Sequence, residues 1–146
     1  MTDSEDLAKC GPACSPDGRY VAYTTKFESK VGLKALNVLN LDSGKLQAVV
    51  PASDLTEEPI TQLLDLRWSP TGDHIAAYAY LMKPGLHTGV GVIDWPSGKF
   101  RWLCKEGRSG FPRWTADGRK VRFARNETQI WEASPGGGDC RVVARL

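Results

Sequence analysis

The chain has 146 residues, of which 41% are hydrophobic and 25% are charged, so its length and composition fit about one soluble globular domain. Its formal net charge of +2 is too small to indicate a nucleic-acid or membrane partner, although residues 1–65 carry −4, residues 66–106 carry +2 and residues 107–146 carry +4. No apolar run approaches the roughly 18 residues of a membrane helix, and MTDSEDLAKC lacks the basic-then-apolar order of a signal peptide.

Residues 1–7 are predicted to be an acidic tail, and two cysteines follow it. Cys10 and Cys14 flank Gly-Pro, in a pattern similar to a stretched thioredoxin-type redox motif. On one extended strand their Cα atoms would lie about 13 Å apart, whereas a disulfide requires about 7 Å or less. We therefore expect reduced, structural thiols, which are typical of a cytoplasmic protein. A zinc site is not predicted, because Cys104 and Cys140 stand alone and no Cys-x-x-Cys spacing occurs.

A short segment occurs three times along the chain. ACSPDGRYVAY (13–23) recurs as RWSPTGDHIAAY (67–78) and as RWTADGRKVRF (113–123). Aligned on the Ser or Thr that opens the turn, the copies are offset by 54 and 46 residues.

A second segment follows each copy of the first. VLNLDSGKLQAVV (38–50), VIDWPSGKFRWL (92–103) and IWEASPGGGDCRVV (130–143) each place a Gly-containing turn between two β-rich runs. The two turns are 29 residues apart in the first two copies and 21 residues apart in the third. Two segments that recur at a common spacing indicate a repeat architecture.

The first turn of each copy has a mechanical explanation. In Ser-Pro-Asp-Gly, Pro16 presets φ for the first central position, and Gly18 accepts the left-handed geometry that follows. Gly72 and Gly118 keep this glycine where other turn residues change. We therefore predict that four residues form these turns: Pro16, Gly18, Gly72 and Gly118.

Each copy is predicted to form four short antiparallel strands, because β-rich runs alternate with turns and nothing longer shows a helical period. Four strands in about 45–55 residues are typical of one propeller blade. The predicted fold is all-β, with three four-stranded blades at 8–53, 54–106 and 107–146, and thus a partial or half propeller.

Cys14, Trp68 and Trp114 occupy the same place in the three copies, directly before the first turn. We predict that they pack between neighbouring blades. With the residues that follow, RWSPTGDHIAAY and RWTADGRKVRF resemble the repeats of TolB-like propellers, which are similar in pattern to WD-repeat propellers. The resemblance covers most of residues 8–146 and implies a propeller architecture, but such repeats do not define an activity.

Three blades leave both ends of the array open, since closed propellers have about four to eight. Large exposed apolar faces usually mark interfaces, so we expect a second copy or another protein to complete the ring. The charge gradient favours a head-to-tail homodimer, because an acidic first blade would meet a basic third blade. A monomeric mass in solution would exclude this ring of two chains.

No catalytic, metal-binding or cofactor-binding residue is predicted. His74 adjoins a turn and His87 lies in a loop, and neither accompanies a Ser or Cys motif of nucleophilic catalysis. The glycines of residues 85–91 lead into a strand rather than a helix, so they lack the free amides of a phosphate-binding loop. A flexible loop is the favoured interpretation of that stretch.

The third blade raises an RNA-binding function as an alternative. Several of its residues are of types that bind phosphates and bases: Arg108, Arg113, Arg119, Lys120, Arg122, Arg125, Phe111, Trp114 and Trp131. Nucleic acid is nevertheless disfavoured as a partner, because Trp114 is assigned to the core and the arginines alternate along strands whose other face is expected to be buried.

The loops opposite the tight turns vary in length, and variable loops on a rigid scaffold are usual recognition sites. They span residues 26–34, 51–61, 81–88 and 105–110. The residues predicted to contact a partner are Phe27, Tyr80, Met82, His87 and Arg108.

The sequence therefore predicts a non-catalytic, propeller-type interaction scaffold. The alternative from a different class is the propeller portion of a larger enzyme, such as the substrate-gating domain of prolyl-oligopeptidase-type peptidases, which the repeats resemble. In that case the catalytic residues would lie outside these 146 residues.

Overall fold

The computed structural model describes residues 12–25, 35–49, 60–81, 87–104 and 108–146. Within these ranges the chain forms three four-stranded antiparallel sheets and no helix, which confirms the prediction of an all-β chain built from propeller blades. Sheet 1 contains β1 (Ala13–Cys14), β2 (Tyr20–Thr25), β3 (Ala35–Asn40) and β4 (Leu46–Val49). Sheet 2 contains β5 (Ile60–Trp68), β6 (His74–Leu81), β7 (His87–Asp94) and β8 (Phe100–Cys104). Sheet 3 contains β9 (Ser109–Trp114), β10 (Val121–Arg125), β11 (Gln129–Ala133) and β12 (Arg141–Arg145).

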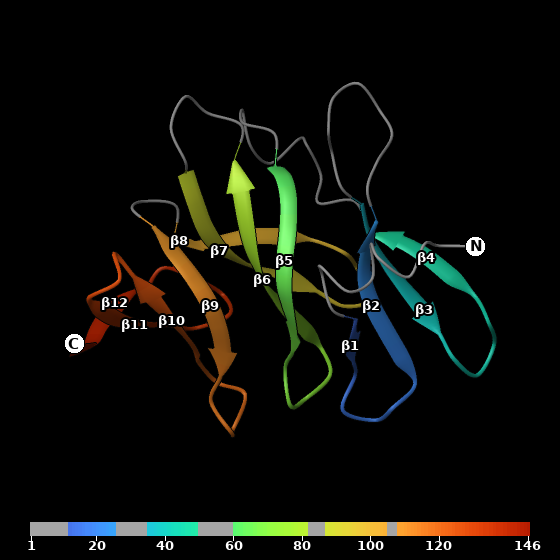
Figure 1. Ribbon diagram of the computed structural model, residues 1–146. Helices are drawn as coiled ribbons and strands as arrows, with labels where there is room; N and C mark the ends of the chain where they lie inside the picture. The colour runs from blue at the N-terminus through green and yellow to red at the C-terminus, as the bar shows by residue number, and fades with distance from the viewer. Residues whose placement is uncertain (1–11, 26–34, 50–59, 82–86, 105–107) are drawn as a thin grey trace.

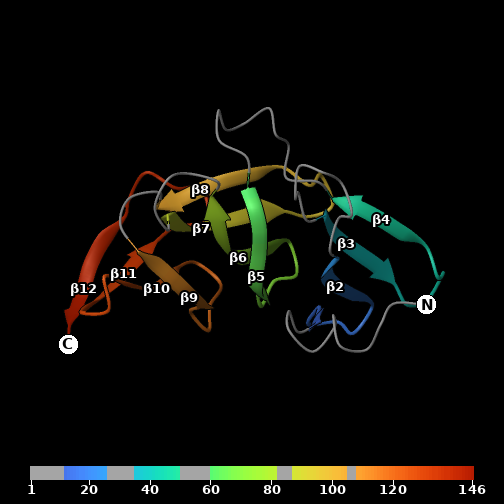
Figure 2. The same ribbon diagram turned by 45° about the horizontal axis from the view of Figure 1, so that its top comes forward.

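Each sheet is a meander, because hydrogen-bonded neighbours within it are consecutive in the chain. We refer to the sheets as blades 1 to 3. Their first strands, β1, β5 and β9, lie along the inner edge of the array, where β5 contacts both of the others (Figure 1). The last strands, β4, β8 and β12, lie on the outer side, and the three blades follow one another in an open arc (Figure 2).

The strands extend further into the predicted loops than the sequence indicated. Strand β5 begins at Ile60, and Leu81 pairs with His87 at the far end of β6 and β7. The blade boundaries predicted at 7/8, 53/54 and 106/107 fall outside the described residues and stay predictions.

A hydroxyl group organises the first turn of each blade. It belongs to the residue that opens the turn and accepts a hydrogen bond from the backbone amide five residues later. The donor–acceptor pairs are Tyr20 to Ser15 at 2.9 Å, His74 to Ser69 at 3.1 Å, and Lys120 to Thr115 at 3.1 Å. The recurring sequence motif is therefore a recurring hydrogen-bonded turn.

The turn glycines also contribute to contacts between blades. Gly18, Gly72 and Gly118 have φ values of +72°, +77° and +71°, a region that side chains other than glycine rarely adopt. A Cβ atom at Gly72 would lie 3.8 Å from the ring of Pro16, and one at Gly118 would lie 3.5 Å from the ring of Pro70. Each of these two turns therefore packs against the turn of the preceding blade.

The core consists of two apolar layers, each between neighbouring blades. The layer between blades 1 and 2 contains buried side chains from both: Ala22, Leu36 and Val38 from blade 1, with Ile75, Ile93 and Phe100 from blade 2. The layer between blades 2 and 3 is built in the same way, from Ala76, Val90, Val92, Val121, Phe123 and Ala133. Burial of these faces against one another holds the arc together.

Gly89 and Gly91 lie in strand β7, so the interpretation of this stretch as a flexible loop was wrong for them. A Cβ atom at Gly91 would lie 2.3 Å from Cζ of Phe100, and one at Gly89 would lie 2.7 Å from the ring of Trp102. The two glycines leave room for aromatic rings that cross the strand from β8.

Candidate functional site

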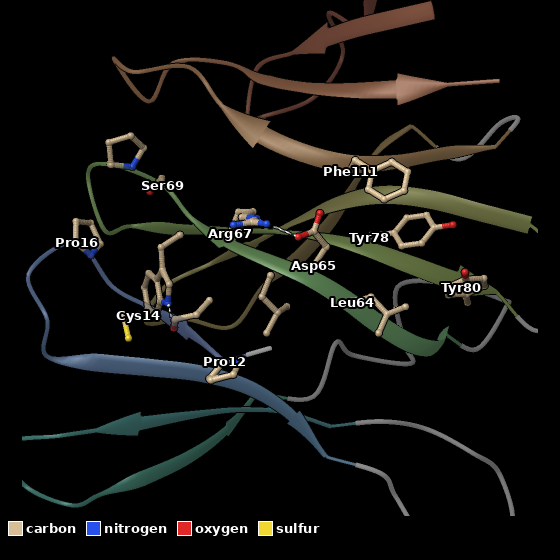
Figure 3. A pocket seen from close by; sticks show the side chains of 14 residues that line it. Pro12, Cys14, Pro16, Leu64, Asp65, Arg67, Ser69, Tyr78, Tyr80 and Phe111 are labelled. Carbon is tan, nitrogen blue, oxygen red and sulfur yellow. Dashed lines mark hydrogen bonds and ion pairs between the residues drawn. The ribbon is translucent and has the colours of Figure 1, made fainter. Parts of the chain in front are cut away.

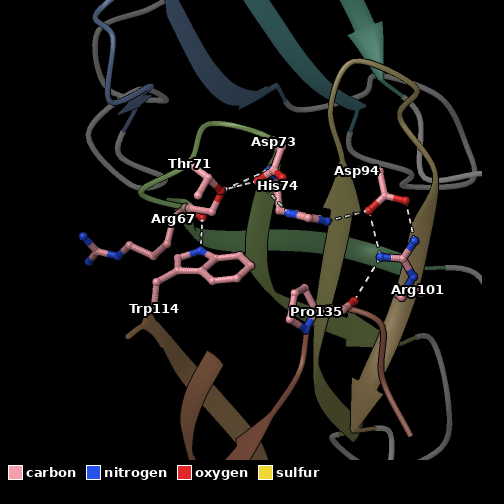
Figure 4. Close-up of polar contacts among 9 residues, drawn as sticks. Arg67, Thr71, Asp73, His74, Asp94, Arg101, Trp114 and Pro135 are labelled. Atoms are coloured by element: carbon pink, nitrogen blue, oxygen red, sulfur yellow. Dashed lines mark hydrogen bonds and ion pairs between the residues drawn. The ribbon is translucent and has the colours of Figure 1, made fainter. Parts of the chain in front are cut away.

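Each junction between blades carries a hydrogen bond from a tryptophan. The indole Nε1 of Trp68 donates to the carbonyl of Ala13 at 2.9 Å, and Nε1 of Trp114 donates to the carbonyl of Arg67 at 2.8 Å (Figure 4). Each acceptor stands directly before Cys14 or Trp68 in the sequence, so the two junctions repeat the same contact. The two predicted interblade tryptophans therefore lie at the junctions, where Trp68 is buried and Trp114 is half-buried.

A second hydrogen bond recurs at the outer end of each junction. Gln47 of β4 donates from Nε2 to the carbonyl of Pro96 in blade 2 at 3.2 Å. Arg101 of β8 donates from Nη1 to the carbonyl of Pro135 in blade 3 at 3.0 Å, and its guanidinium also binds Asp94 (Figure 4). In both junctions the last strand of one blade therefore reaches the second turn of the next.

One face of each blade, here called the leading face, is turned toward the preceding blade. In blade 2, four apolar residues on this face are cross-strand neighbours and are buried: Trp68, Ile75, Ile93 and Phe100. In blade 3 the corresponding residues are Trp114, Val121 and Ala133. The opposite face is here called the trailing face, and in blades 1 and 2 it packs on the next blade.

The leading face of blade 1 carries an apolar row in the same register. Cys14 pairs with Val21, Val21 with Leu39, and Leu39 with Leu46. Cys14 is exposed, Leu46 is 51% exposed, and the other two are half-buried. Among the described residues, blade 1 packs on blade 2 through its trailing face only. Cys14 lies on the other face and is exposed, whereas the sequence predicted an interblade core residue at this position.

A groove of about 850 Å³ runs along the inner edge, between the first strands of the blades (Figure 3). Its polar centre is Asp65, whose carboxylate accepts hydrogen bonds from Arg67 at 2.8 Å and from Arg113 of blade 3 at 2.8 Å. Asp65 has a φ of +48° at a β-bulge in β5, and Phe111, three residues before Trp114, has a φ of +57° at the equivalent place in β9.

The bulge in blade 3 carries an exposed aromatic side chain. Phe111 is 69% exposed and stacks on Tyr78 at 6.2 Å between ring centroids, and Tyr78 in turn contacts the edge of Tyr80 (Figure 3). Burial raises the pKa of the Tyr78 hydroxyl. These three rings line both the groove and a second cavity of about 320 Å³, which Arg108 also lines. Such a surface can bind a planar apolar group on Phe111 and an anionic group through a neighbouring guanidinium.

Two of the predicted partner-contact residues therefore meet at one site. Tyr80 and Arg108 both line the smaller cavity, whereas His87 is the first residue of β7. Phe27 and Met82 lie outside the described residues. Sequence reasoning missed Asp65 as a groove residue and Phe111 as its aromatic wall.

The basic residues of blade 3 are largely paired with carboxylates. Their ion pairs include Arg113 with Asp65 at 2.8 Å, Lys120 with Asp139 at 2.5 Å, Arg122 with Glu132 at 3.0 Å, Arg141 with Glu132 at 3.3 Å, and Arg108 with Glu127 at 3.8 Å. In addition, Arg125 lies over the ring of Trp131, 4.2 Å from its centroid. This pairing reduces the positive potential that RNA binding would need.

His74 belongs to a polar network that supports the first turn of blade 2 (Figure 4). Its Nδ1 lies 2.8 Å from Asp73, and its Nε2 lies 3.3 Å from Asp94 of β7. Ser69 is buried and donates its hydroxyl to Asp73 at 3.0 Å, so the carboxylate stands between the hydroxyl and the imidazole. The hydroxyl of Thr71 is the main cause of a lowered pKa at Asp73. This arrangement stabilises the turn and differs from the hydroxyl–imidazole contact of an activated serine.

Cys104 and Cys140 adjoin one another at the junction of blades 2 and 3, where Cys104 is buried and Cys140 packs against the same apolar cluster. Burial, followed by the neighbouring Cys104, raises the pKa of Cys140 to about 11. Within the described ranges no group of three or more His, Cys, Asp or Glu side chains could hold a metal ion, and Cys10 lies outside them. A search for a helix able to cross a membrane, limited to the described residues, finds none.

We expect Cys140 to be alkylated more slowly than Cys14. At pH 8 only about 0.1% of a thiol with a pKa near 11 is thiolate, so Cys140 should react with iodoacetamide at least tenfold more slowly than the exposed Cys14. Peptide mapping by mass spectrometry, with fragmentation to separate Cys14 from Cys10, measures both rates. In denaturant the difference should disappear; equal rates in the native protein would contradict the buried environment of Cys140.

No protein-family model matches the sequence, and a search of curated proteins finds no relative. Solved structures do match. TolB from Acinetobacter baumannii superposes with a TM-score of 0.63 at 20% identity, over 90% of this chain and 31% of TolB. The β-propeller domain of the Trilobed protease from Pyrococcus furiosus gives a TM-score of 0.64 at 16% identity, over 92% of this chain and 42% of that one.

The Pyrococcus horikoshii acylaminoacyl peptidase is a third similar structure, with a TM-score of 0.66 at 14% identity over 92% of this chain and 24% of the peptidase. The chain thus spans less than half of each of these proteins. At these identities the similarity concerns the fold, and it confirms the resemblance of the repeats to TolB-like propeller blades.

Proposed function

We propose that this chain is a non-catalytic propeller scaffold that binds another polypeptide blade on the leading face of blade 1. The observation that carries the proposal is the row of Cys14, Val21, Leu39 and Leu46. It repeats, in register, the apolar rows that are buried at the two internal junctions. Burial of such an apolar sheet face against a second sheet lowers the free energy, because it removes the face from water.

The internal junctions supply the geometry for such a complex. In both of them a leading face packs on the trailing face of a neighbouring blade, and the first turns of the two blades lie against each other. The similar solved structures are considerably longer than this chain, which matches 31% of TolB and 42% of the propeller domain of the Trilobed protease. A further blade on blade 1 would continue the same arrangement.

A photo-reactive phenylalanine derivative at position 46 should cross-link to a β-strand of another polypeptide, because Leu46 lies on the open leading face. The matched control is position 41. Leu41 and Leu46 are both 51% exposed, but Leu41 lies in the turn after β3. Mass spectrometry of the adducts formed in the producing cell identifies the peptide that is attached at each position.

We expect a defined adduct at position 46 and at most background labelling at position 41. Equal labelling at both positions would contradict the proposed function, and so would an adduct confined to other parts of the same chain. The variants Leu46→Lys and Leu41→Lys test the same surface without a cross-linker, since only the first should abolish formation of the complex.

A further inference from the structure

The trailing face of blade 3 differs in chemistry from those of blades 1 and 2. The cross-strand row on this face reads Ala13, Ala22, Val38 and Gln47 in blade 1, and Arg67, Ala76, Val92 and Arg101 in blade 2. In blade 3 the same register positions hold Arg113, Arg122, Glu132 and Arg141. The small apolar pair at the centre of the row has been replaced by an arginine and a glutamate.

These charged residues bind one another within blade 3. Glu132 is buried, and its carboxylate lies 3.0 Å from Nε of Arg122 and 3.3 Å from Nη2 of Arg141. The Arg122 guanidinium is the main cause of a lowered pKa at Glu132. The Arg122 and Arg141 side chains are 58% and 70% exposed, so their charged groups remain in contact with water.

Arg141 shows most directly how blade 3 departs from the repeat. Its counterparts Gln47 and Arg101 donate hydrogen bonds to a proline carbonyl in the second turn of the following blade. Arg141 instead contacts Glu132 of its own blade. The side chain that connects one blade to the next is therefore held within the last blade.

A blade packed on this face would have to desolvate the guanidinium groups and the carboxylate, which costs several kcal/mol per ion and is offset only in part by their mutual attraction. Terminal repeats of repeat proteins carry polar outer faces for this reason. The charged row covers the part of the face nearest the first turn, and the adjacent row is apolar: Ala124, Ile130 and Ala144.

The charge gradient favoured a head-to-tail ring in which blade 1 of one copy meets blade 3 of another. That contact would place Cys14, Val21, Leu39 and Leu46 on the charged row. The described acidic residues of blade 1, Asp17 and Asp42, lie in turns rather than on the leading face, so they do not face this row. The row is matched better by small apolar residues such as those on the trailing faces of blades 1 and 2.

We infer that blade 3 is the closed end of the array, and that the partner is a blade of a different polypeptide that presents small apolar side chains to blade 1. This inference rests on the proposed function and narrows it, because it excludes a second copy bound through blade 3. Cys14 leaves the space that an indole fills at the internal junctions, so the partner can place a larger side chain there.

The test combines Arg122→Ala, Glu132→Val and Arg141→Gln, which gives blade 3 the last three residues of the trailing row of blade 1 and leaves Arg113 in place. We expect the native chain to have a monomeric mass by light scattering at micromolar concentration. The triple variant should instead rise in mass by about twofold or more, because its trailing face now fits the leading face of another copy. Adding Leu46→Lys should return the mass to that of the monomer. Arg119→Ala is the control for loss of a positive charge in blade 3, and circular dichroism verifies that each variant folds.

Three other outcomes would overturn the inference. If the native chain is oligomeric and the triple variant dissociates it, blade 3 is part of the interface. If the triple variant stays monomeric while folded, the charged row is not what closes this end. If the native chain forms a dimer that Leu46→Lys abolishes and the triple variant leaves intact, the partner is a second copy bound through blade 1. The third case still places a partner on blade 1, and the first two leave that surface to the cross-linking experiment, so the proposed function fails only if nothing binds there.

Discussion

Replacing Trp68 by alanine should lower the free energy of unfolding by about 3–5 kcal/mol, the range for removing a large aromatic side chain from a core. Trp68 is 9% exposed and belongs to the apolar layer between blades 1 and 2. It stacks on Tyr20 of blade 1 and meets the edge of Trp95, while its Nε1 donates to the carbonyl of Ala13. Alanine would therefore leave a cavity at the junction as well as an unpaired acceptor. Urea denaturation followed by circular dichroism measures the loss.

Trp68→Phe separates the packing of the ring from its hydrogen bond. Phenylalanine keeps most of the aromatic surface but has no indole N–H, so the loss should be about 1–2 kcal/mol. Trp114→Ala is the matched control at the next junction, and its effect should be smaller because Trp114 is only half-buried. A loss below 1 kcal/mol for Trp68→Ala would show that the junction of blades 1 and 2 does not depend on this residue.

The strands and first turns could be predicted because their causes are local. Gly18, Gly72 and Gly118 are needed for a left-handed backbone, and the hydroxyl three residues before each glycine binds an amide close by in sequence. The alternation of apolar residues after these turns was also visible, since one side of each strand is buried. Signals of this kind survive in a single sequence, and the repeats reinforced them.

The candidate site depended on contacts between blades, which the sequence alone did not reveal. Cys14 aligned with two interblade tryptophans, yet it is exposed because blade 1 has no described neighbour on that side. Arg122 and Glu132 looked like parts of a basic blade, and only the strand register shows that they pair on the trailing face. The bulge at Phe111 had one available signal: the first copy has Gly11 at the aligned position, and glycine is the residue that most readily adopts a left-handed φ such as that of Phe111.

Gly91→Ala should destabilise the protein by about 2–3 kcal/mol, the effect of overpacking a closely packed core. A Cβ atom at this position would lie 2.3 Å from Cζ and 2.4 Å from Cε2 of Phe100, and 3.1 Å from the carbonyl of Arg101. The ring of Phe100 cannot move aside easily, because it is 2% exposed and is packed edge-on against Trp102 at 4.9 Å. Since Phe100 lies on the leading face of blade 2, the methyl group would push this ring into the junction with blade 1.

A double-mutant cycle with Phe100→Leu tests this mechanism by urea denaturation. Phe100→Leu alone should destabilise the native chain, because it removes aromatic surface from the junction. In the Gly91→Ala background the same change should recover part of the lost stability, because leucine does not extend to the position of Cζ. The two effects should therefore be non-additive by about 1 kcal/mol or more. Gly136→Ala is the control, since nothing lies within 4 Å of a Cβ atom there, and it should be nearly neutral. Additive losses for Gly91→Ala and Phe100→Leu would show that the glycine is not required by the ring.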